Sequence, residues 1–143
     1  MEERKPLRVA IIGCSKTKRP GRRKVRYLYC SARFKQSLAY ALKEYDRVYV
    51  ASAKHGLLGL DQTVQSYDLS LDTLTERGQR RWALKVALQI RKNIPADAKL
   101  DFYCSKKYRD PLAGMLEGRE VAAPLAHLGR SQQMTWYKKH LKS

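Results

Sequence analysis

Three short apolar runs, separated by segments with helical periodicity, constrain the fold of this chain most strongly. They are LRVAIIG (7–13), DRVYVAS (46–52) and KLDFYCS (99–105). Each has the length and the Val, Ile, Leu or aromatic content of a buried strand. Strands that alternate with helices pair in parallel, because each helix carries the chain back along one face of the sheet. We therefore expect an α/β fold of three layers (α/β/α) with a mainly parallel central sheet of about four strands.

Helical periodicity fills the segments between these runs. Apolar residues recur at helical spacing over 31–44, with Ser31 as the N-cap. A second helix presents Trp82 on its apolar face and begins at a capping box formed by Thr73 and Glu76. Both predicted helices are long enough to connect parallel strands.

The last third of the chain predicts smaller elements. Residues 108–118 predict a short helix, residues 119–125 a fourth strand or extended piece, and residues 131–143 a closing helix capped by Ser131. No internal repeat or low-complexity linker interrupts the 143 residues. Because a chain of this length forms one core more readily than two, residues 1–143 are expected to form a single domain.

The chain is strongly basic, with 30 Lys and Arg residues against 13 Asp and Glu residues and a net charge of +17. This excess indicates a polyanionic partner, and nucleic acid, either DNA or structured RNA, is the first candidate. The alternative is a generically basic protein whose charge serves only solubility.

Positive charge is concentrated near the start of the chain. No acidic residue occurs between Glu3 and Glu44, although thirteen Lys and Arg residues do. The loop after the first apolar run is expected to bind phosphates, because Arg offers forked contacts and Lys offers point charges. Tyr27 and Tyr29 in this loop either stack on unpaired bases or pack beneath the loop. The predicted phosphate-binding residues of the loop are Lys18, Arg19, Arg22, Arg23, Lys24 and Arg26.

Several classes of protein are disfavoured. No window approaches the roughly 18 apolar residues of a membrane span, and the N-terminus lacks a signal-peptide cleavage site, so we expect a cytoplasmic protein. The cysteines Cys14, Cys30 and Cys104 are odd in number and form no C-x-x-C pair, which disfavours a disulfide framework. The histidines lie far from the cysteines in sequence, so we expect no metal site and no cofactor. The oligomeric state is left open.

Polar residues follow each apolar run, at the edge where the ligand crevice of a parallel sheet lies. After the first run, Cys14, Ser15 and Lys16 could hold an anion with backbone N–H groups, although the spacing of a Walker loop is absent. Cys14 is either a nucleophile or a buried, inert thiol. After the third run, Ser105 and Lys106 are further candidates for phosphate binding.

The second run is followed by SAKHG and, later, by a Tyr-Asp pair. His55 is a candidate acid or base near neutral pH, and Lys54 a candidate for Schiff-base chemistry or a phosphate contact. Asp68 could activate water or stabilise an oxocarbenium-like centre while a glycosidic bond breaks, and Tyr67 beside it is assigned to nucleic-acid binding. Structural alternatives stay open: a histidine bonded to the backbone, and an aspartate that caps a turn.

The chain resembles a family of small uncharacterised bacterial and phage proteins with C-[SV]-K-T-K, L-Y-x-S-x-x-F and S-A-K-H-G-L-L motifs. The resemblance spans about residues 8–141 and is carried by GCSKTK, LYCSARFKQSLAYA, ASAKHGLL, YDLSL and PLAHLGRSQQMTWYKKHL. The first loop, RPGRRKVR, is more basic than that pattern, which supports a polyanionic partner.

More distantly, the chain is similar to the core domain of archaeosine synthase. Cys14, Ser15 and Lys16 match its C-S-x-K start in part, and Tyr67 with Asp68 match its Y-D pair. The proline and tyrosine that follow in the synthase are absent here.

The synthase domain is related in fold to the uracil-DNA glycosylases, which are three-layer α/β/α enzymes that flip a base into a pocket at the strand ends. The resemblance implies a glycosylase-like nucleic-acid enzyme that acts on a base, modified or not, or on its N-glycosidic bond. In such an enzyme, Ser15 and Lys16 would hold the flipped nucleotide, and His55 and Asp68 would perform the acid–base or electrostatic work. The glycosylase motif G-[QE]-D-P-Y is absent. A non-catalytic DNA- or RNA-binding module and a nucleotide- or nucleoside-processing enzyme are the alternatives.

Overall fold

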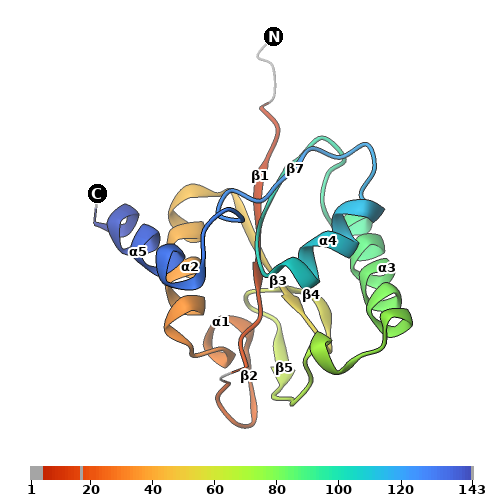
Figure 1. Ribbon diagram of the computed structural model, residues 1–143, viewed down its shortest axis with the longest axis horizontal. Helices are drawn as coiled ribbons and strands as arrows, with labels where there is room; N and C mark the ends of the chain where they lie inside the picture. Colours follow the sequence, from red (N-terminus) through yellow and green to blue (C-terminus); the bar gives the residue numbers. More distant parts are fainter. Residues whose placement is uncertain (1–4, 17, 143) are drawn as a thin grey trace.

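A five-stranded, mostly parallel sheet forms the centre of the protein (Figure 1). The computed structural model describes residues 5–16 and 18–142, so Thr17 of the GCSKTK motif lies outside the described residues. Along the sheet the strand order is β4-β3-β1-β6-β7, in which only β4 runs antiparallel to its neighbour. The strands are β1 (Arg8–Gly13), β3 (Arg47–Ser52), β4 (Gly56–Gly59), β6 (Lys99–Tyr103) and β7 (Val121–Ala122). The expected α/β class with a mainly parallel sheet is confirmed, with one strand more than the four expected.

Helices cover both faces of the sheet (Figure 1). Helices α2 (Ala32–Glu44) and α5 (Arg130–Leu141) lie together on one face. Helices α3 (Glu76–Asn93) and α4 (Lys106–Met115) lie on the other. The sheet between two helical layers gives the three-layer α/β/α arrangement.

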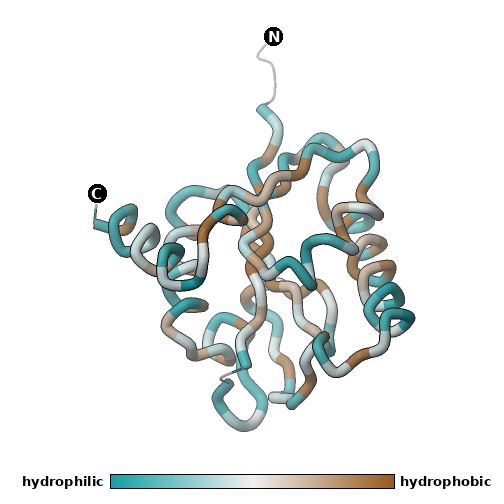
Figure 2. The backbone as a smooth tube through the Cα atoms, viewed as in Figure 1, coloured by the Kyte–Doolittle hydropathy of each residue, from teal (hydrophilic) through white to brown (hydrophobic). Residues whose placement is uncertain are grey.

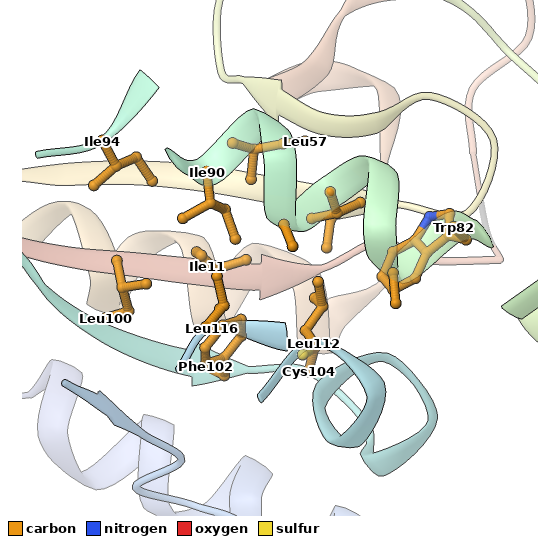
Figure 3. Packing of buried hydrophobic residues seen from close by; sticks show 14 of the residues in the cluster. Ile11, Leu57, Trp82, Ile90, Ile94, Leu100, Phe102, Cys104, Leu112 and Leu116 are labelled. Carbon is orange, nitrogen blue, oxygen red and sulfur yellow. The ribbon is translucent and has the colours of Figure 1, made fainter. Parts of the chain in front are cut away.

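Strand β1 divides the hydrophobic core in two, because successive side chains of a strand point to opposite faces. Val9 and Ile11 are buried in the cluster that includes α3 and α4, whereas Ala10 and Ile12 are buried in the cluster that includes α2. Figure 3 shows Ile11 among its neighbours from α3 and β6. Figure 2 shows that hydrophobic residues are concentrated in the central strands. The uninterrupted apolar run of β1 is therefore explained by burial on both faces.

Besides β4, four short elements outside the central sheet were not predicted from the sequence. Beyond the carboxyl end of β1, a two-stranded antiparallel ribbon pairs β2 with β5, and a short helix and a 3-10 turn flank it (Figure 1). The four elements are β2 (Arg22–Lys24), α1 (Val25–Leu28), β5 (Thr63–Gln65) and η1 (Leu71–Thr73).

The segment SAKHG is the turn of a hairpin between β3 and β4. Ser52 pairs with Gly56, which has a φ of 76°. Glycine suits this position because a side chain would strain a backbone with positive φ. The chain thus turns back beside β3 after its carboxyl end, rather than leaving the sheet there.

Two predicted helix caps were wrong. Helix α3 is capped by Thr75, whose Oγ1 accepts a hydrogen bond from the backbone N of Gly78 at 3.1 Å. Thr73 belongs to η1, so the predicted capping box does not form. Helix α5 begins at Arg130 with Gly129, not Ser131, as its N-cap residue, and Ser131 therefore lies within its first turn. The predicted cap of α2 is confirmed, since the Oγ of Ser31 accepts from the backbone N of Phe34.

The carboxyl end of α3 is held by Arg119, whose guanidinium donates to the carbonyl oxygens of Ile94 (2.9 Å) and Pro95 (2.6 Å). Hydrogen bonds to charged groups contribute about 1.5–3 kcal/mol. We expect Arg119→Ala to lower the free energy of unfolding by about 1–2 kcal/mol, measured by urea denaturation. Lys92→Ala, an exposed residue in the last turn of the same helix, is the control. Equal denaturation midpoints for the two variants would contradict the role of Arg119.

The structure also bears on membrane insertion. Within residues 5–16 and 18–142, no helix is long and apolar enough to cross a membrane.

Candidate functional site

A cavity of about 620 Å³ lies at the carboxyl ends of β1 and β6, and we call it the strand-end cavity. Its walls come from the residues after these strands, from the first turns of α2 and α5, and from the loop that contains η1. This is the position at which parallel α/β sheets bind ligands, since the loops there are free to vary while the sheet stays rigid. The volume lies within the roughly 300–1,000 Å³ of small-molecule sites.

The lining of the strand-end cavity is rich in positive charge. Lys16, Lys18, Arg33 and Arg130 all line it. Among the described residues of the lining, Asp72 is the one carboxylate. These groups together favour a negatively charged ligand.

The Asp72 carboxylate is itself partly neutralised. A salt bridge and hydrogen bond from the Nζ of Lys107 lowers the pKa of Asp72 below its ordinary value, and Lys16 adds to this effect. Asp72 is therefore ionised at neutral pH, at the side of a cavity that otherwise carries positive charge.

Three helices begin at the strand-end cavity. The cavity is lined by Ser31, whose side chain caps α2, by Ser105, the residue that precedes α4, and by Arg130, the first residue of α5. The first turn of each helix carries unpaired backbone N–H groups and the positive end of the helix dipole. The backbone thus adds to the positive potential that the side chains create.

Aromatic side chains complete the walls. Phe34, Tyr103, Tyr108 and Tyr137 line the cavity. Burial raises the pKa of Tyr103 to about 12, and it also raises the pKa of Tyr108 and Tyr137. The hydroxyls therefore stay neutral, and the Tyr108 hydroxyl lies 3.3 Å from the Sγ of Cys14. Phe34 and Tyr137 are buried, so the half-buried Tyr103 and Tyr108 are the rings that can face a planar group, beside cations that can bind a phosphate.

Five of the residues predicted to bind nucleic acid lie in this lining: Cys14, Ser15, Lys16, Lys18 and Ser105. Lys106 is exposed at the start of α4 and outside the lining, where its Nζ lies 3.9 Å from a carboxylate oxygen of Asp110. Positions 19–26 lie on the ribbon and α1, outside the lining.

The three predicted catalytic residues do not line the cavity. Lys54 is exposed in the turn between β3 and β4, and Asp68 is exposed in the loop after β5. The ring of His55 meets the ring of Tyr67 edge-on, with 5.1 Å between their centroids. The backbone N of His55 donates to the Oγ of Ser52 at 3.0 Å, so the main chain of this turn is fixed by the end of β3.

A buried network of hydroxyl groups joins Ser52, Tyr67 and Tyr29. The Oγ of Ser52 donates to the Tyr67 hydroxyl at 2.7 Å, and this hydroxyl lies 2.6 Å from that of Tyr29. Burial raises the pKa of Tyr29 to about 12 and also raises the pKa of Tyr67. The Nζ of Lys18 lies 4.4 Å from the centroid of the Tyr67 ring. Tyr67 therefore makes a cation–π contact with Lys18, which is one of the cations that line the strand-end cavity.

The two tyrosines of the first loop differ in environment. Tyr29 is buried in the hydroxyl network, as the packing alternative required. Tyr27 is 60% exposed on α1. Only Tyr27 therefore offers its ring to a partner without rearrangement.

Sequence reasoning missed Arg33, Asp72, Tyr108 and Arg130. Arg33 and Arg130 stand in the first turns of α2 and α5, and the Nη2 of Arg33 donates to Gln133 of α5 at 2.6 Å. A helix that follows a parallel strand begins at the carboxyl edge of the sheet, so cations near the helix starts were the available signal. Asp72 had no comparable signal, because its position depends on the fold of η1.

No group of three or more His, Cys, Asp or Glu side chains in the described part of the chain is arranged to hold a metal ion. The cysteines Cys14, Cys30 and Cys104 are free thiols, and burial raises the pKa of the Cys104 thiol to about 12. Cys104 is therefore a protonated, unreactive group at neutral pH.

No curated protein and no solved structure matches the chain. A match to the Family of unknown function (DUF6884) covers residues 9–139 and so includes the central sheet except Arg8, the first residue of β1. The chain therefore belongs to this family.

Proposed function

We propose that the protein is a nucleic-acid enzyme that takes one nucleotide into the strand-end cavity and acts on its base or N-glycosidic bond. The observation that carries the proposal is the composition of the cavity, in which cations and aromatic rings line a space of about 620 Å³. Phosphate, sugar and base together present the anionic and planar groups that such a lining complements. The distant similarity to archaeosine synthase and to the uracil-DNA glycosylases supports the same class of reaction.

The cations have the simplest role. Lys16, Arg33 and Arg130 bind the phosphates of the nucleotide, assisted by the starts of α2 and α5. The aromatic rings bind the base, which leaves the stacked helix for the cavity. Because the partner is nucleic acid and the cysteines are free, we place this activity in the cytoplasm.

The chemistry requires a carboxylate near the sugar. In hydrolysis of the glycosidic bond, a water oxygen bonds to C1′, the bond from C1′ to the base nitrogen breaks, and the base leaves with a proton. Positive charge develops on the sugar ring in the transition state, and a fixed carboxylate stabilises it. Asp72 takes this role in place of Asp68, because Asp72 lines the cavity and is ionised.

A non-catalytic nucleic-acid-binding module is the second candidate. The observation that favours it is the ion pair of Asp72 with Lys107, which occupies the carboxylate that the reaction needs. In this case the cavity binds a nucleotide and leaves it unchanged.

The two candidates are separated by incubating the protein with duplex DNA, single-stranded DNA and tRNA, with and without modified bases. Released and altered bases are measured by mass spectrometry. We expect a base to be released or altered, and we expect Asp72→Asn to slow this reaction about tenfold, a modest loss because Asp72 is exposed to solvent. Asp68→Asn is the matched control and should react at the wild-type rate.

Two outcomes would count against the enzyme. Binding without any released or altered base selects the binding module. If Asp68→Asn abolished the reaction and Asp72→Asn left its rate unchanged, the catalytic carboxylate would be Asp68, in the loop after β5.

A further inference from the structure

We propose that the β2–β5 ribbon enters the major groove of duplex DNA, and that the nucleotide in the strand-end cavity is everted from that duplex. The ribbon comprises β2, β5 and the turn at Gly21, and it projects beyond the carboxyl end of β1 (Figure 1). This inference rests on the proposed function, and it adds the polymer and its helical form.

The ribbon has an outer face without negative charge. In its register Arg22 lies opposite Gln65, and Lys24 lies opposite Thr63, and all four residues are exposed. Val64, opposite Arg23, is half-buried and packs against the core. Because side chains alternate along a strand, the four exposed residues share the face that points away from the core. This face carries two cations and two neutral hydrogen-bonding groups.

Acids are absent from the sequence of the ribbon itself. Residues 18–29 and 62–66 contain no Asp or Glu. The neighbouring carboxylate, Asp61, is paired with the guanidinium of Arg26 at 2.9 Å. The residues of the ribbon themselves therefore present no carboxylate to a phosphate backbone.

The ribbon is fixed to the domain rather than hanging as a free loop. The backbone N of Ser66 donates to the carbonyl of Gly21 at 2.8 Å, and that of Val25 donates to Gln62 at 2.9 Å. Val25 and Leu28 of α1, which follows β2 directly, are fully buried. A fixed ribbon loses little conformational entropy on binding, which favours a specific docking position.

The ribbon and the strand-end cavity are physically joined through Lys18. This residue forms an isolated bridge with Tyr29 at the base of the ribbon, and its side chain lines the cavity. A duplex held on the ribbon is therefore next to the cations of the cavity.

The shape of the ribbon selects the kind of duplex. The major groove of B-form DNA, about 12 Å wide, admits a two-stranded ribbon, and Arg and Gln there pair with guanine and adenine edges. In A-form RNA the major groove is deep and narrow, and side chains do not reach the bases. Arg22 and Gln65 lie opposite each other on the outer face of the ribbon. The width of the groove and the types of these two side chains therefore both favour DNA over RNA.

The test compares two double variants that remove the same charge. Arg22→Ala with Lys24→Ala removes the cations of the outer face, and Arg80→Ala with Arg81→Ala removes two exposed cations of α3. Fluorescence anisotropy measures binding to a short DNA duplex and to an RNA duplex of the same sequence, across a salt series. Mononucleotide binding is measured in parallel.

For the wild type we expect tighter binding to the DNA duplex than to the RNA duplex. The ribbon variant should lose about tenfold in affinity for DNA, chiefly through the base contact of Arg22, and about one unit of salt slope through the phosphate contact of Lys24. It should bind mononucleotides as the wild type does, since Arg22 and Lys24 do not line the cavity. The α3 variant should lose less affinity than the ribbon variant. Its loss should be the same for the DNA duplex and for the RNA duplex.

The inference is overturned if the two double variants lose DNA affinity equally, or if the wild type binds the RNA duplex as tightly as the DNA duplex. Neither result contradicts the proposed function of the strand-end cavity, provided that mononucleotides still bind. Failure of mononucleotides and of every nucleic acid to bind would instead defeat the proposed function.

Discussion

Exchange of Arg130 for glutamate is expected to weaken nucleic-acid binding about 100-fold while leaving the fold at least as stable as the wild type. Arg130 lines the strand-end cavity, so the exchange replaces an attractive charge by a repulsive one where phosphate binds. Arg130 is also the first residue of α5, and a negative side chain at a helix start stabilises the helix by about 0.3–1 kcal/mol. Affinity and stability should therefore move in opposite directions, which excludes unfolding as the cause of lost binding.

Lys139→Glu is the matched control, because it changes the net charge by the same amount on the same helix. Lys139 is exposed in the last turn of α5 and does not line the cavity. We expect it to weaken binding severalfold at most and to lower stability slightly, since helix ends favour cations at the carboxyl terminus. Fluorescence anisotropy with short DNA and thermal unfolding measure the two quantities. If both variants lose the same affinity, binding follows net charge alone and the cavity has no special role.

The largest loss of stability is expected from Trp82→Ala, at about 3–5 kcal/mol. Trp82 is buried in the core between the sheet and α3, where Figure 3 shows it at the end of the row formed by Ile90 and Ile94. Its Nε1 donates to the carbonyl of Ser52 at 2.8 Å, and its ring meets that of Tyr108 with 5.2 Å between centroids. Truncation removes ring contacts, leaves a cavity and orphans the Ser52 carbonyl at once.

Urea denaturation measures the loss, and two further variants give it a scale. Trp82→Phe keeps a ring but loses the hydrogen bond, so we expect a loss of about 1–2 kcal/mol. Leu88→Ala lies on the same helix but is 55% exposed, so we expect a change within about 0.5 kcal/mol. A Trp82→Ala loss no larger than that of Leu88→Ala would show that this part of the core is not packed as described.

The central strands and the long helices could be predicted because each carries its own signal. The run over 7–13 is apolar on both faces, and α2 and α3 have long apolar stripes behind capping residues. Strand β2, by contrast, reads Arg-Arg-Lys and has no apolar residue. Its pairing with β5 is set by contacts between segments far apart in sequence, which local patterns do not record.

The candidate site was predicted in part for a related reason. Residues 14–16 and Ser105 follow parallel strands and do reach the strand-end cavity. The segment SAKHG follows β3 in the same way, yet β4 returns antiparallel and forms a hairpin at the edge of the sheet. Lys54 and His55 therefore sit in a hairpin turn instead of a crossover loop. The rule for strand ends applies where the chain crosses over, and GLLG was too short a run to reveal the hairpin.

The place of β1 in the strand order has a consequence for synthesis of the chain. One edge of β1 pairs with β3, and the other pairs with β6, which is made much later. A nascent chain that ends before β6 can assemble β4, β3 and β1, but the second edge of β1 then stays open. An open, apolar strand edge is a template for pairing with other chains. Interrupted translation of this protein is therefore expected to yield aggregates rather than a soluble half-domain.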